Sequence, residues 1–283
     1  MKTYKIDNHL LGTNGALYSF DPYDVNNLPK NTVLVRTSGE FKEHPSTVLM
    51  DSYDAYYPTD IPNEYLVYKQ SNDWSNLLAA HTEITDILGA NTSSVYNLSG
   101  AFRSCTNVSS VAWCDTSNVT NMNSTFRDCY RITDIPAFDT SNVTSMEDTF
   151  VRLNISSTPQ LDYSKVTSLK RCFDYCSRLK VTNISAPECT SFYSTFHGCQ
   201  QFGGYIDATT THVPAVSCTP YMPKAIDVSY MYSGCFYMSY PYDVYNIIKN
   251  NTNITSHQLT FSGAGAWSDT GSAQLAQIPS DWK

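Results

Sequence analysis

The sequence contains few charged residues and no cluster of basic ones. Asp, Glu, Lys and Arg make up 16% of the 283 residues, and the formal net charge is −8. An acidic surface without a Lys/Arg patch does not attract the phosphate backbone of nucleic acids. We therefore expect no nucleic-acid partner.

Two membrane-related signals are also missing. The first residues, Met1–Asp7, have neither the apolar run nor the small-residue cleavage site of a secretory signal. No apolar stretch approaches the roughly 20 residues that span a bilayer, so we expect no membrane span. Either a leader has been removed, or the chain is made in a cytoplasm and leaves by another route, as a phage structural protein does on lysis.

Motifs for catalysis and cofactor binding are absent as well. The sequence has no P-loop, dinucleotide fingerprint, nucleophile elbow or zinc-protease motif, and its six histidines fall in separate segments. Cys172-x-x-x-Cys176 and His197-Gly198-Cys199 supply metal-capable atoms, but without the paired spacing of zinc fingers. We expect no enzyme activity, no cofactor and no metal site. Only a glycoside-hydrolase carboxylate pair is left open, because its separation depends on the fold.

What the sequence does contain is one pattern repeated five times. An apolar residue is followed by a second after three positions, by Phe after four more, and in most copies by Cys after a further three. The Phe positions are 24, 24, 23 and 23 residues apart, and a weaker sixth copy with Tyr232 follows after 36. A near-constant interval of this size predicts coils that each bury their apolar side against a neighbour.

The spacing inside each copy would keep one face of a short helix apolar. A short stretch with alternating apolar residues, such as Val108–Val111, follows and predicts a strand. We therefore predict an α/β solenoid, a leucine-rich-repeat-like stack of five to six coils of about 24 residues, each a short helix plus a short strand. The predicted structural core ladder comprises Phe102, Phe126, Phe150, Phe173, Phe196, Cys105, Cys129, Cys176, Cys199 and Cys235.

Two segments carry a family resemblance. Asp115–Cys129 (DTSNVTNMNSTFRDC) and Phe138–Met146 (FDTSNVTSM) resemble the BspA-type leucine-rich repeat. The resemblance covers residues 91–217, with a weak copy at 224–239. Such repeats occur in bacterial and mycoplasmal surface proteins and in proteins of phages that infect gut bacteria, and the end of this chain, 263–282, resembles the C-terminal cap of the phage proteins. The resemblance implies the fold strongly and the function weakly, because such repeats serve many partners.

The nine cysteines allow two interpretations. Cys side chains in register on neighbouring coils point the same way, which suits disulfide geometry poorly, and Leu153 takes the Cys position in the third coil. We therefore favour buried free thiols over disulfides in the ladder. An isolated bridge is left open among the cysteines outside it, which are Cys114, Cys172, Cys189 and Cys218.

The other segments are expected to cap the repeats. We divide the chain into an N-terminal arm or docking segment (1–30), a small β-rich region (31–72), a capping helix (73–90), the solenoid (91–240) with an irregular insertion (207–224), and a C-terminal cap (241–283). Alternating apolar residues predict strands at Asn31–Phe41, Ser46–Asp51 and Glu64–Gln70.

Two helices are expected outside the repeats. The apolar face of Asp73–Leu88, followed by Gly89, predicts the capping helix. Tyr242–Asn251 predicts a second, shorter one.

The chain is rich in Tyr, with 21 residues, and in Ser, Thr and Asn. Such a surface makes adaptable hydrogen bonds and aromatic contacts, and the concave strand face of a solenoid is the usual place for them. The candidate binding face comprises Ser110, Trp113, Tyr130, Arg131, Thr133, Asp134, Arg178 and Lys180. A solvated face with two incidental aromatics explains these residues equally well. A second candidate is the Tyr-rich stretch Tyr230–Tyr242, which we expect to be half core and half available to a partner or glycan.

A repeat scaffold without site chemistry indicates recognition. We expect a non-enzymatic phage virion structural protein that mediates protein–protein or host-surface attachment, either as a tail or fibre adhesion element or as a capsid decoration. Its N-terminal region would contact other virion proteins, a host surface protein or glycan could be the ligand, and a homo-oligomer is allowed. The alternative is a bacterial cell-surface adhesin or binding protein with the same kind of repeat.

Overall fold

The architecture is described from a computed structural model of the 283-residue chain. The residues that the structure describes are 9–11, 17–19, 28–41, 55–59, 61–112, 114–204 and 214–283. The predicted strand Ser46–Asp51, most of the predicted arm 1–30 and the first part of the predicted insertion lie outside them. Within the described part, no helix is both long and apolar enough to cross a bilayer.

Regular strands are concentrated near the N-terminus. One sheet has the order β4-β5-β3-β6-β7, formed by β3 (Thr32–Thr37), β4 (Ala55–Pro58), β5 (Glu64–Tyr68), β6 (Ile84–Asn91) and β7 (Ser110–Val111). All its pairs are antiparallel except β6 with β7. A separate antiparallel hairpin consists of β1 (His9–Leu11) and β2 (Leu17–Ser19).

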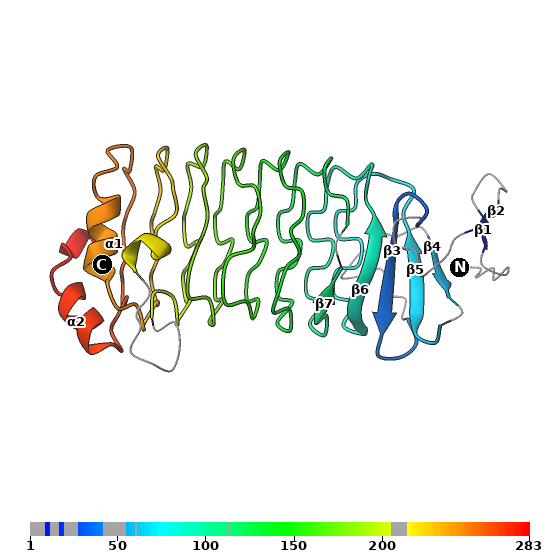
Figure 1. The fold of residues 1–283 in the computed structure, drawn as a ribbon, viewed down its shortest axis with the longest axis horizontal. Coiled ribbons are helices and arrows are strands. Elements are labelled where there is room, and N and C mark those ends of the chain that lie inside the picture. The colour runs from blue at the N-terminus through cyan, green and yellow to red at the C-terminus, as the bar shows by residue number, and fades with distance from the viewer. Residues whose placement is uncertain are drawn as a thin grey trace.

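Alternation along β3 sends side chains to two cores. Val33 and Val35 join the main hydrophobic core, whereas Leu34 packs with Leu28 and Leu66 on the other face of the sheet. This is the period of two that a strand imposes on its side chains. The sheet is therefore buried on both faces around β3, and it lies toward the N-terminal end of the molecule, with the β1–β2 hairpin farther out (Figure 1).

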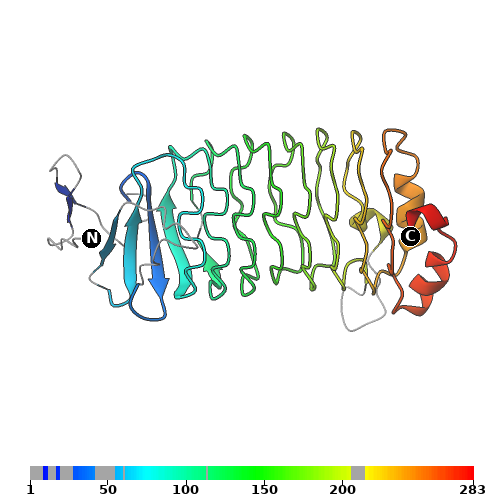
Figure 2. The ribbon, with the colours of Figure 1, turned by 180° about the vertical axis from the view of Figure 1, so that it is seen from behind.

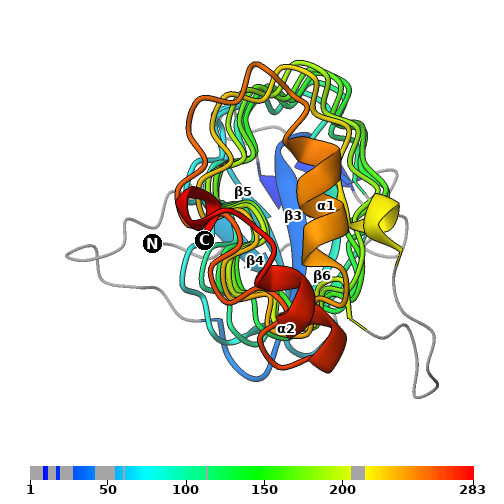
Figure 3. The same cartoon turned by 90° about the vertical axis from the view of Figure 1, so that its left-hand side faces the viewer.

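The rest of the chain is a row of similar segments that lie side by side (Figures 1 and 2). Isolated parallel bridges join each segment to the next, and the bridge residues are Asp73, Asn97, Asn121, Ser145, Ser168, Ser191, Asp227 and Ser256. We call the stretch from one bridge residue to the next a layer. Seen along the long axis the layers superimpose, and the C-terminal helices cover one end (Figure 3).

Backbone hydrogen bonds join the layers in an alternating pattern. The N–H groups of Leu98, Gly100, Phe102 and Ser104 donate to carbonyls of the next layer at 2.7–3.0 Å. The N–H groups between them bond within the layer, as Ala101 does to Leu98 at 3.0 Å. Every backbone donor of this stretch thus has a partner without any helix or long strand.

The predicted α/β solenoid of helix-plus-strand coils is wrong. Among the described residues, the α-helices are α1 (Pro241–Ile248) and α2 (Asp269–Leu275), both C-terminal to the predicted solenoid 91–240, and β7 is the one strand within 92–204. In the first predicted coil, Gly100 and Ser104 have φ of 66° and 62°. A right-handed helix requires negative φ, whereas a type II turn requires a positive one at its third residue.

The apolar spacing misled the prediction because two conformations share it. A helix brings residues three and four apart to one face. Two successive four-residue turns, here Leu98–Ala101 and Phe102–Cys105, do the same, with closing N–H···O distances of 3.0 and 3.2 Å. Left-handed residues recur at the same places in the following layers, for example Ser124 and Asp128.

The predicted capping helix at 73–90 is also wrong. Asn76 and Ala80 have positive φ, at 54° and 64°, and the chain then enters β6. The segment is itself a layer, since Asp73 bridges to Asn97 and the N–H of Leu78 donates to the carbonyl of Ala101 at 2.7 Å. Leu78 thus occupies a position equivalent to Phe102, which is why the Phe-based pattern did not include this layer.

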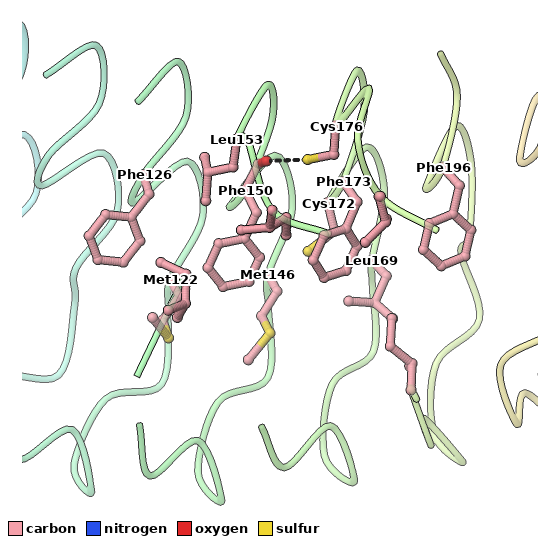
Figure 4. Packing of buried hydrophobic residues seen from close by; sticks show 14 of the residues in the cluster. Met122, Phe126, Met146, Phe150, Leu153, Leu169, Cys172, Phe173, Cys176 and Phe196 are labelled. Atoms are coloured by element: carbon pink, nitrogen blue, oxygen red, sulfur yellow. Dashed lines mark hydrogen bonds between the residues drawn. The ribbon is translucent and has the colours of Figure 1, made fainter. Parts of the chain in front are cut away.

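Aromatic rings stack through the interior of the layers. Ring centroids are 5.6 Å apart for Phe102 and Phe126, 6.3 Å for Phe126 and Phe150, 5.4 Å for Phe150 and Phe173, and 5.9 Å for Phe173 and Phe196. Interplanar angles of 6–21° make these offset stacks. The middle of this row is drawn in Figure 4. Tyr232 and Phe261 extend the row into the last layers.

All nine cysteines are free. The thiols of the ladder donate to the carbonyl of the aromatic or apolar residue in the preceding layer, as Cys176 does to Phe150 at 3.0 Å (Figure 4) and Cys129 to Phe102 at 3.1 Å. A small side chain that can also donate a weak hydrogen bond fits this place. The ladder cysteines thus join neighbouring layers without a covalent bond.

The C-terminal segment closes the other end. The helix predicted at Tyr242–Asn251 corresponds to α1, which begins one residue earlier and ends three residues earlier. The 3-10 helix η2 (Ala215–Cys218) precedes the last layers, and η3 (Ser280–Trp282) ends the chain. The carbonyl of Trp282 accepts the N–H of Phe261 at 2.9 Å.

This cap supplies one stability prediction. Gly265 has φ of 75°, and a Cβ there would lie 2.6 Å from the Met238 carbonyl oxygen and 2.8 Å from the Gly271 Cα. Both contacts are with backbone, so Gly265→Ala should lower the free energy of unfolding by about 3 kcal/mol in urea denaturation. Gly39→Ala is the matched control, because no atom lies within 4 Å of its Cβ position. Equal stabilities of the two variants would contradict the packing described for this cap.

Candidate binding surface

The predicted binding-face residues lie on several layers. Tyr130, Arg131, Thr133 and Asp134 are all exposed in the segment that follows Cys129. Arg178 is exposed and Lys180 half-buried in the equivalent segment two layers on, Ser110 is exposed in β7, and Trp113 lies outside the described residues. Six of the eight predicted residues are thus exposed, but they do not form a strand face, since β7 contributes only one of them.

Backbone hydrogen bonds show how these segments follow one another. The N–H of Asn154 donates to the Ile132 carbonyl and that of Lys180 to the Ser156 carbonyl, both at 2.9 Å. The residues after Cys129 and after Cys176 are therefore separated by one layer on the same edge of the row. The predicted face is an extended edge and not a single cleft.

An ion-pair row on adjacent positions was not predicted. Its members are Arg127, Asp128, Asp148, Arg152, Arg171, Asp174 and His197. The Nη1 of Arg127 lies 2.6 Å from the Oδ1 of Asp148, and the Nη1 of Arg152 lies 2.8 Å from the Oδ1 of Asp128. The Nδ1 of His197 lies 2.8 Å from the Oδ1 of Asp174. The pairs join each layer to the next. The one sequence signal for them is that charged residues recur directly after the repeated Phe, as in Arg127, Asp174 and His197.

Two groups of the row have shifted pKa values. Burial raises the pKa of Asp148, although the guanidinium groups of Arg171 and Arg127 oppose the shift. The hydrogen bond to Asp128 raises the pKa of Arg152. Each carboxylate of the row contacts at least one cation, so the row links the layers at this edge. Its positive and negative charges largely compensate one another.

Next to this row lies an exposed tyrosine. The Tyr175 side chain is 49% exposed, with the Arg152 guanidinium 5.7 Å from its ring centroid and the His197 ring edge-on at 5.0 Å. A Cβ on Gly198 would lie 2.7 Å from the Tyr175 Cδ1, so the ring rests on the glycine backbone. The ring is thereby held in place while one side faces solvent.

A second aromatic group lies farther along the edge. We call Phe236, Tyr237 and Trp267 the aromatic edge. The Phe236 and Trp267 rings stack with their centroids 4.2 Å apart, and the Tyr237 ring meets Trp267 edge-on with a centroid distance of 5.6 Å. The backbone N–H of Trp267 donates to the Phe236 carbonyl at 3.0 Å. Trp267 is 58% exposed and Tyr237 41%.

The Tyr-rich stretch Tyr230–Tyr242 divides between core and surface. Tyr232 is fully buried, and its hydroxyl donates to the Cys218 carbonyl at 2.9 Å. Tyr237 is exposed, whereas Tyr230 and Tyr242 are half-buried. Trp267, which completes the aromatic edge, is far along the chain and carries no repeat signal, so the sequence analysis missed it.

The thiols near this surface are held in their protonated form. Burial raises the pKa of every thiol, to about 11 for Cys114 and about 12 for Cys129, Cys189 and Cys218, so the thiolates that act as nucleophiles or metal ligands are scarce at neutral pH. Within the described residues no three His, Cys, Asp or Glu side chains are grouped to hold a metal ion. What the edge offers is guanidinium groups, amides and rings.

Comparison with known proteins agrees with the repeat pattern. Residues 72–186 match a family described as "Mycoplasma protein of unknown function, DUF285". This segment, which is less than half of the chain, therefore carries BspA-like repeats. Searches of curated proteins and of solved structures give no significant match.

Proposed function

We propose that the protein is a non-catalytic attachment protein that binds a surface partner through the exposed edge of its layers. The observation that supports this most directly is the position of Tyr130, Arg131, Arg178, Tyr237 and Trp267. All five are exposed. The first four follow the Cys position of their layers, and the backbone N–H of Trp267 donates to Phe236, which also follows that position. Tyr, Trp and Arg are the side chains most often found as interface anchors.

The scaffold beneath these side chains is preorganised. Each layer donates backbone hydrogen bonds to the next, and the ion-pair row also joins the layers from Arg127 to His197 at their edge. A partner that binds along the edge therefore orders few new groups, which reduces the entropic cost of binding. Aromatic anchors on a rigid support are typical of recognition surfaces.

For the setting, we propose a phage virion, as a tail or fibre adhesion element or a capsid decoration. The resemblance of the repeats and of the C-terminal residues to phage proteins supports it. The second candidate is a bacterial cell-surface adhesin, which the match to a family described from Mycoplasma supports.

The binding of the labelled full-length protein to intact bacterial cells tests the attachment function. Saturable binding is expected to at least one strain in a panel, and Arg131→Ala combined with Arg178→Ala should weaken it several-fold. The matched control is Lys283→Ala, a charge removed from the last residue of the chain. Absence of saturable binding to every strain would overturn the attachment proposal.

The virion setting is tested separately. An antibody against the protein should detect it in purified phage particles after a mild salt wash. Detection on the envelope of uninfected bacteria would instead support the adhesin, and both settings leave the edge as the binding surface.

A further inference from the structure

We infer that the aromatic edge, together with the amides beside it, binds a carbohydrate chain. This inference rests on the proposed attachment function and names the ligand class of the site. It locates the contact at the C-terminal half of the exposed edge, on Trp267 and Tyr237, with Gln200, Gln201 and Arg178 as polar partners.

Trp267 has the properties of a sugar-stacking platform. Its ring is braced on one side by Phe236 at 4.2 Å and at the edge by Tyr237 at 5.6 Å, yet more than half of the side chain faces solvent. A Cβ on Gly263 would lie 3.1 Å from the Phe236 ring, so the glycine lets Phe236 approach the backbone. The indole is therefore fixed before any ligand arrives, and its face can meet the apolar C–H face of a pyranose.

Polar groups adjoin this platform in layer order. The N–H of Tyr237 donates to the Gln200 carbonyl at 3.0 Å, and the N–H of Gln201 donates to the Ser177 carbonyl at 3.2 Å. The side-chain amides of Gln200 and Gln201 are exposed and have no hydrogen-bond partner among the residues that the structure describes. Amides and a guanidinium can donate to and accept from several hydroxyl groups at once.

The direction of the edge suits an extended chain. Successive layers are bonded like neighbouring strands, so they repeat about every 4.8 Å. Arg178, Gln201, Tyr237 and Trp267 lie on four successive layers of this edge. A chain of several sugar units can thus meet one layer after another, with its ring faces on the aromatics and its hydroxyl groups on the amides.

The composition of the surface favours a carbohydrate over an apolar protein partner. Protein docking sites bury a contiguous apolar core with a polar rim. Here the two exposed rings adjoin amides, and the charges of the ion-pair row are already compensated by one another. A small group of rings with neighbouring hydrogen-bonding groups is what ligand sites of mixed polarity require.

The test uses the full chain and defined probes. The probes are oligosaccharides of glucose, N-acetylglucosamine, mannose, galactose and rhamnose, together with purified cell-wall polysaccharides from a strain that the protein binds. We expect saturable binding of at least one probe in calorimetry. Trp267→Ala should weaken it by about tenfold or more, whereas Trp267→Phe should retain most of the affinity because a ring remains.

A matched control separates this edge from exposed aromatics in general. Tyr221 is 61% exposed but lies beside α1, in an open pocket of about 380 Å³ with Ile247 and Asn250. Tyr221→Ala should leave saccharide binding unchanged. Melting temperatures of all variants show whether any loss comes from unfolding.

The outcomes distinguish the two proposals. Cell binding that is abolished by protease treatment of the cells, unaffected by periodate and unchanged in Trp267→Ala would overturn the carbohydrate inference and keep the attachment function. If the protein binds cells but none of the saccharides, the carbohydrate inference is likewise overturned and the attachment function is kept. A protein that binds neither cells nor saccharides would overturn both.

Discussion

The melting temperature of the reduced protein should fall steeply as the pH rises from about 8.5 to about 10. Burial raises the pKa of each of the nine thiols, for example to about 12 for Cys129 and about 12 for Cys189. In the unfolded chain the same thiols ionise near their ordinary pKa of about 8.5. Between these values the folded state keeps protons that the unfolded state releases, so stability decreases as pH rises.

The expected effect is large because so many thiols share it. One pH unit above the unfolded pKa, each contributes about 1.4 kcal/mol in favour of unfolding. Eight of the nine cysteines are buried, so together they oppose folding by an amount on the order of 10 kcal/mol, similar to the whole stability of a typical domain. Below about pH 8 the effect vanishes, because the thiols of both states are protonated.

The measurement is thermal unfolding in a reducing buffer from pH 7 to pH 10, which stays at or below the ordinary tyrosine pKa of about 10. Thiol titration is the companion experiment. Under native conditions at pH 8 a thiol-exchange reagent should label Cys114 first, since it alone is partly exposed, and all nine cysteines after denaturation. A flat melting temperature, or rapid labelling of most thiols in the native state, would contradict the burial of the ladder.

Phe150→Ala is expected to lower the free energy of unfolding by about 4 kcal/mol. Its ring is fully buried, and its centroid lies 6.3 Å from that of Phe126 and 5.4 Å from that of Phe173. Removal of the ring therefore leaves a cavity between two layers. Each layer packs mainly on its neighbours, so nothing else can fill that space without moving a whole layer. Urea unfolding measures the change.

Tyr130→Ala is the matched aromatic truncation on the surface. The Tyr130 side chain is exposed, so its loss should change the unfolding free energy by no more than about 0.5 kcal/mol. A loss below about 1 kcal/mol in Phe150→Ala would mean that the stacked rings do not carry the stability assigned to them.

Sequence and structure agree best where the repeat interval decides the matter. The interval between Phe102 and Phe126 recurs in the backbone bridges, for instance between Asn97 and Asn121. Val95 and Cys105, which the pattern placed on the apolar side, are fully buried. An apolar residue repeated at a constant interval must face the same interior in every layer, so this information is local.

The backbone conformation could not be obtained in the same way. Arg152 and Tyr175 have φ of 61° and 58°, a region that residues other than Gly seldom adopt and that no propensity scale predicts for them. The N–H of Arg152 donates to the Asp174 carbonyl and that of Tyr175 to the His197 carbonyl, so hydrogen bonds to residues 22 positions later, in the next layer, hold them there. Local spacing therefore suggested helices where tertiary contacts impose turns.

The candidate surface shows the same division. Arg131 and Arg178 stand out in the sequence as polar residues after the Cys position, whereas the contact of Phe236 with Trp267 joins segments without a shared motif. By itself the sequence determined the period, the inward-facing residues and the low charge, because each depends on residue type and spacing alone. The tertiary structure decided the turn conformation, the ion-pair row and the aromatic edge, because each arises only when neighbouring layers come into contact.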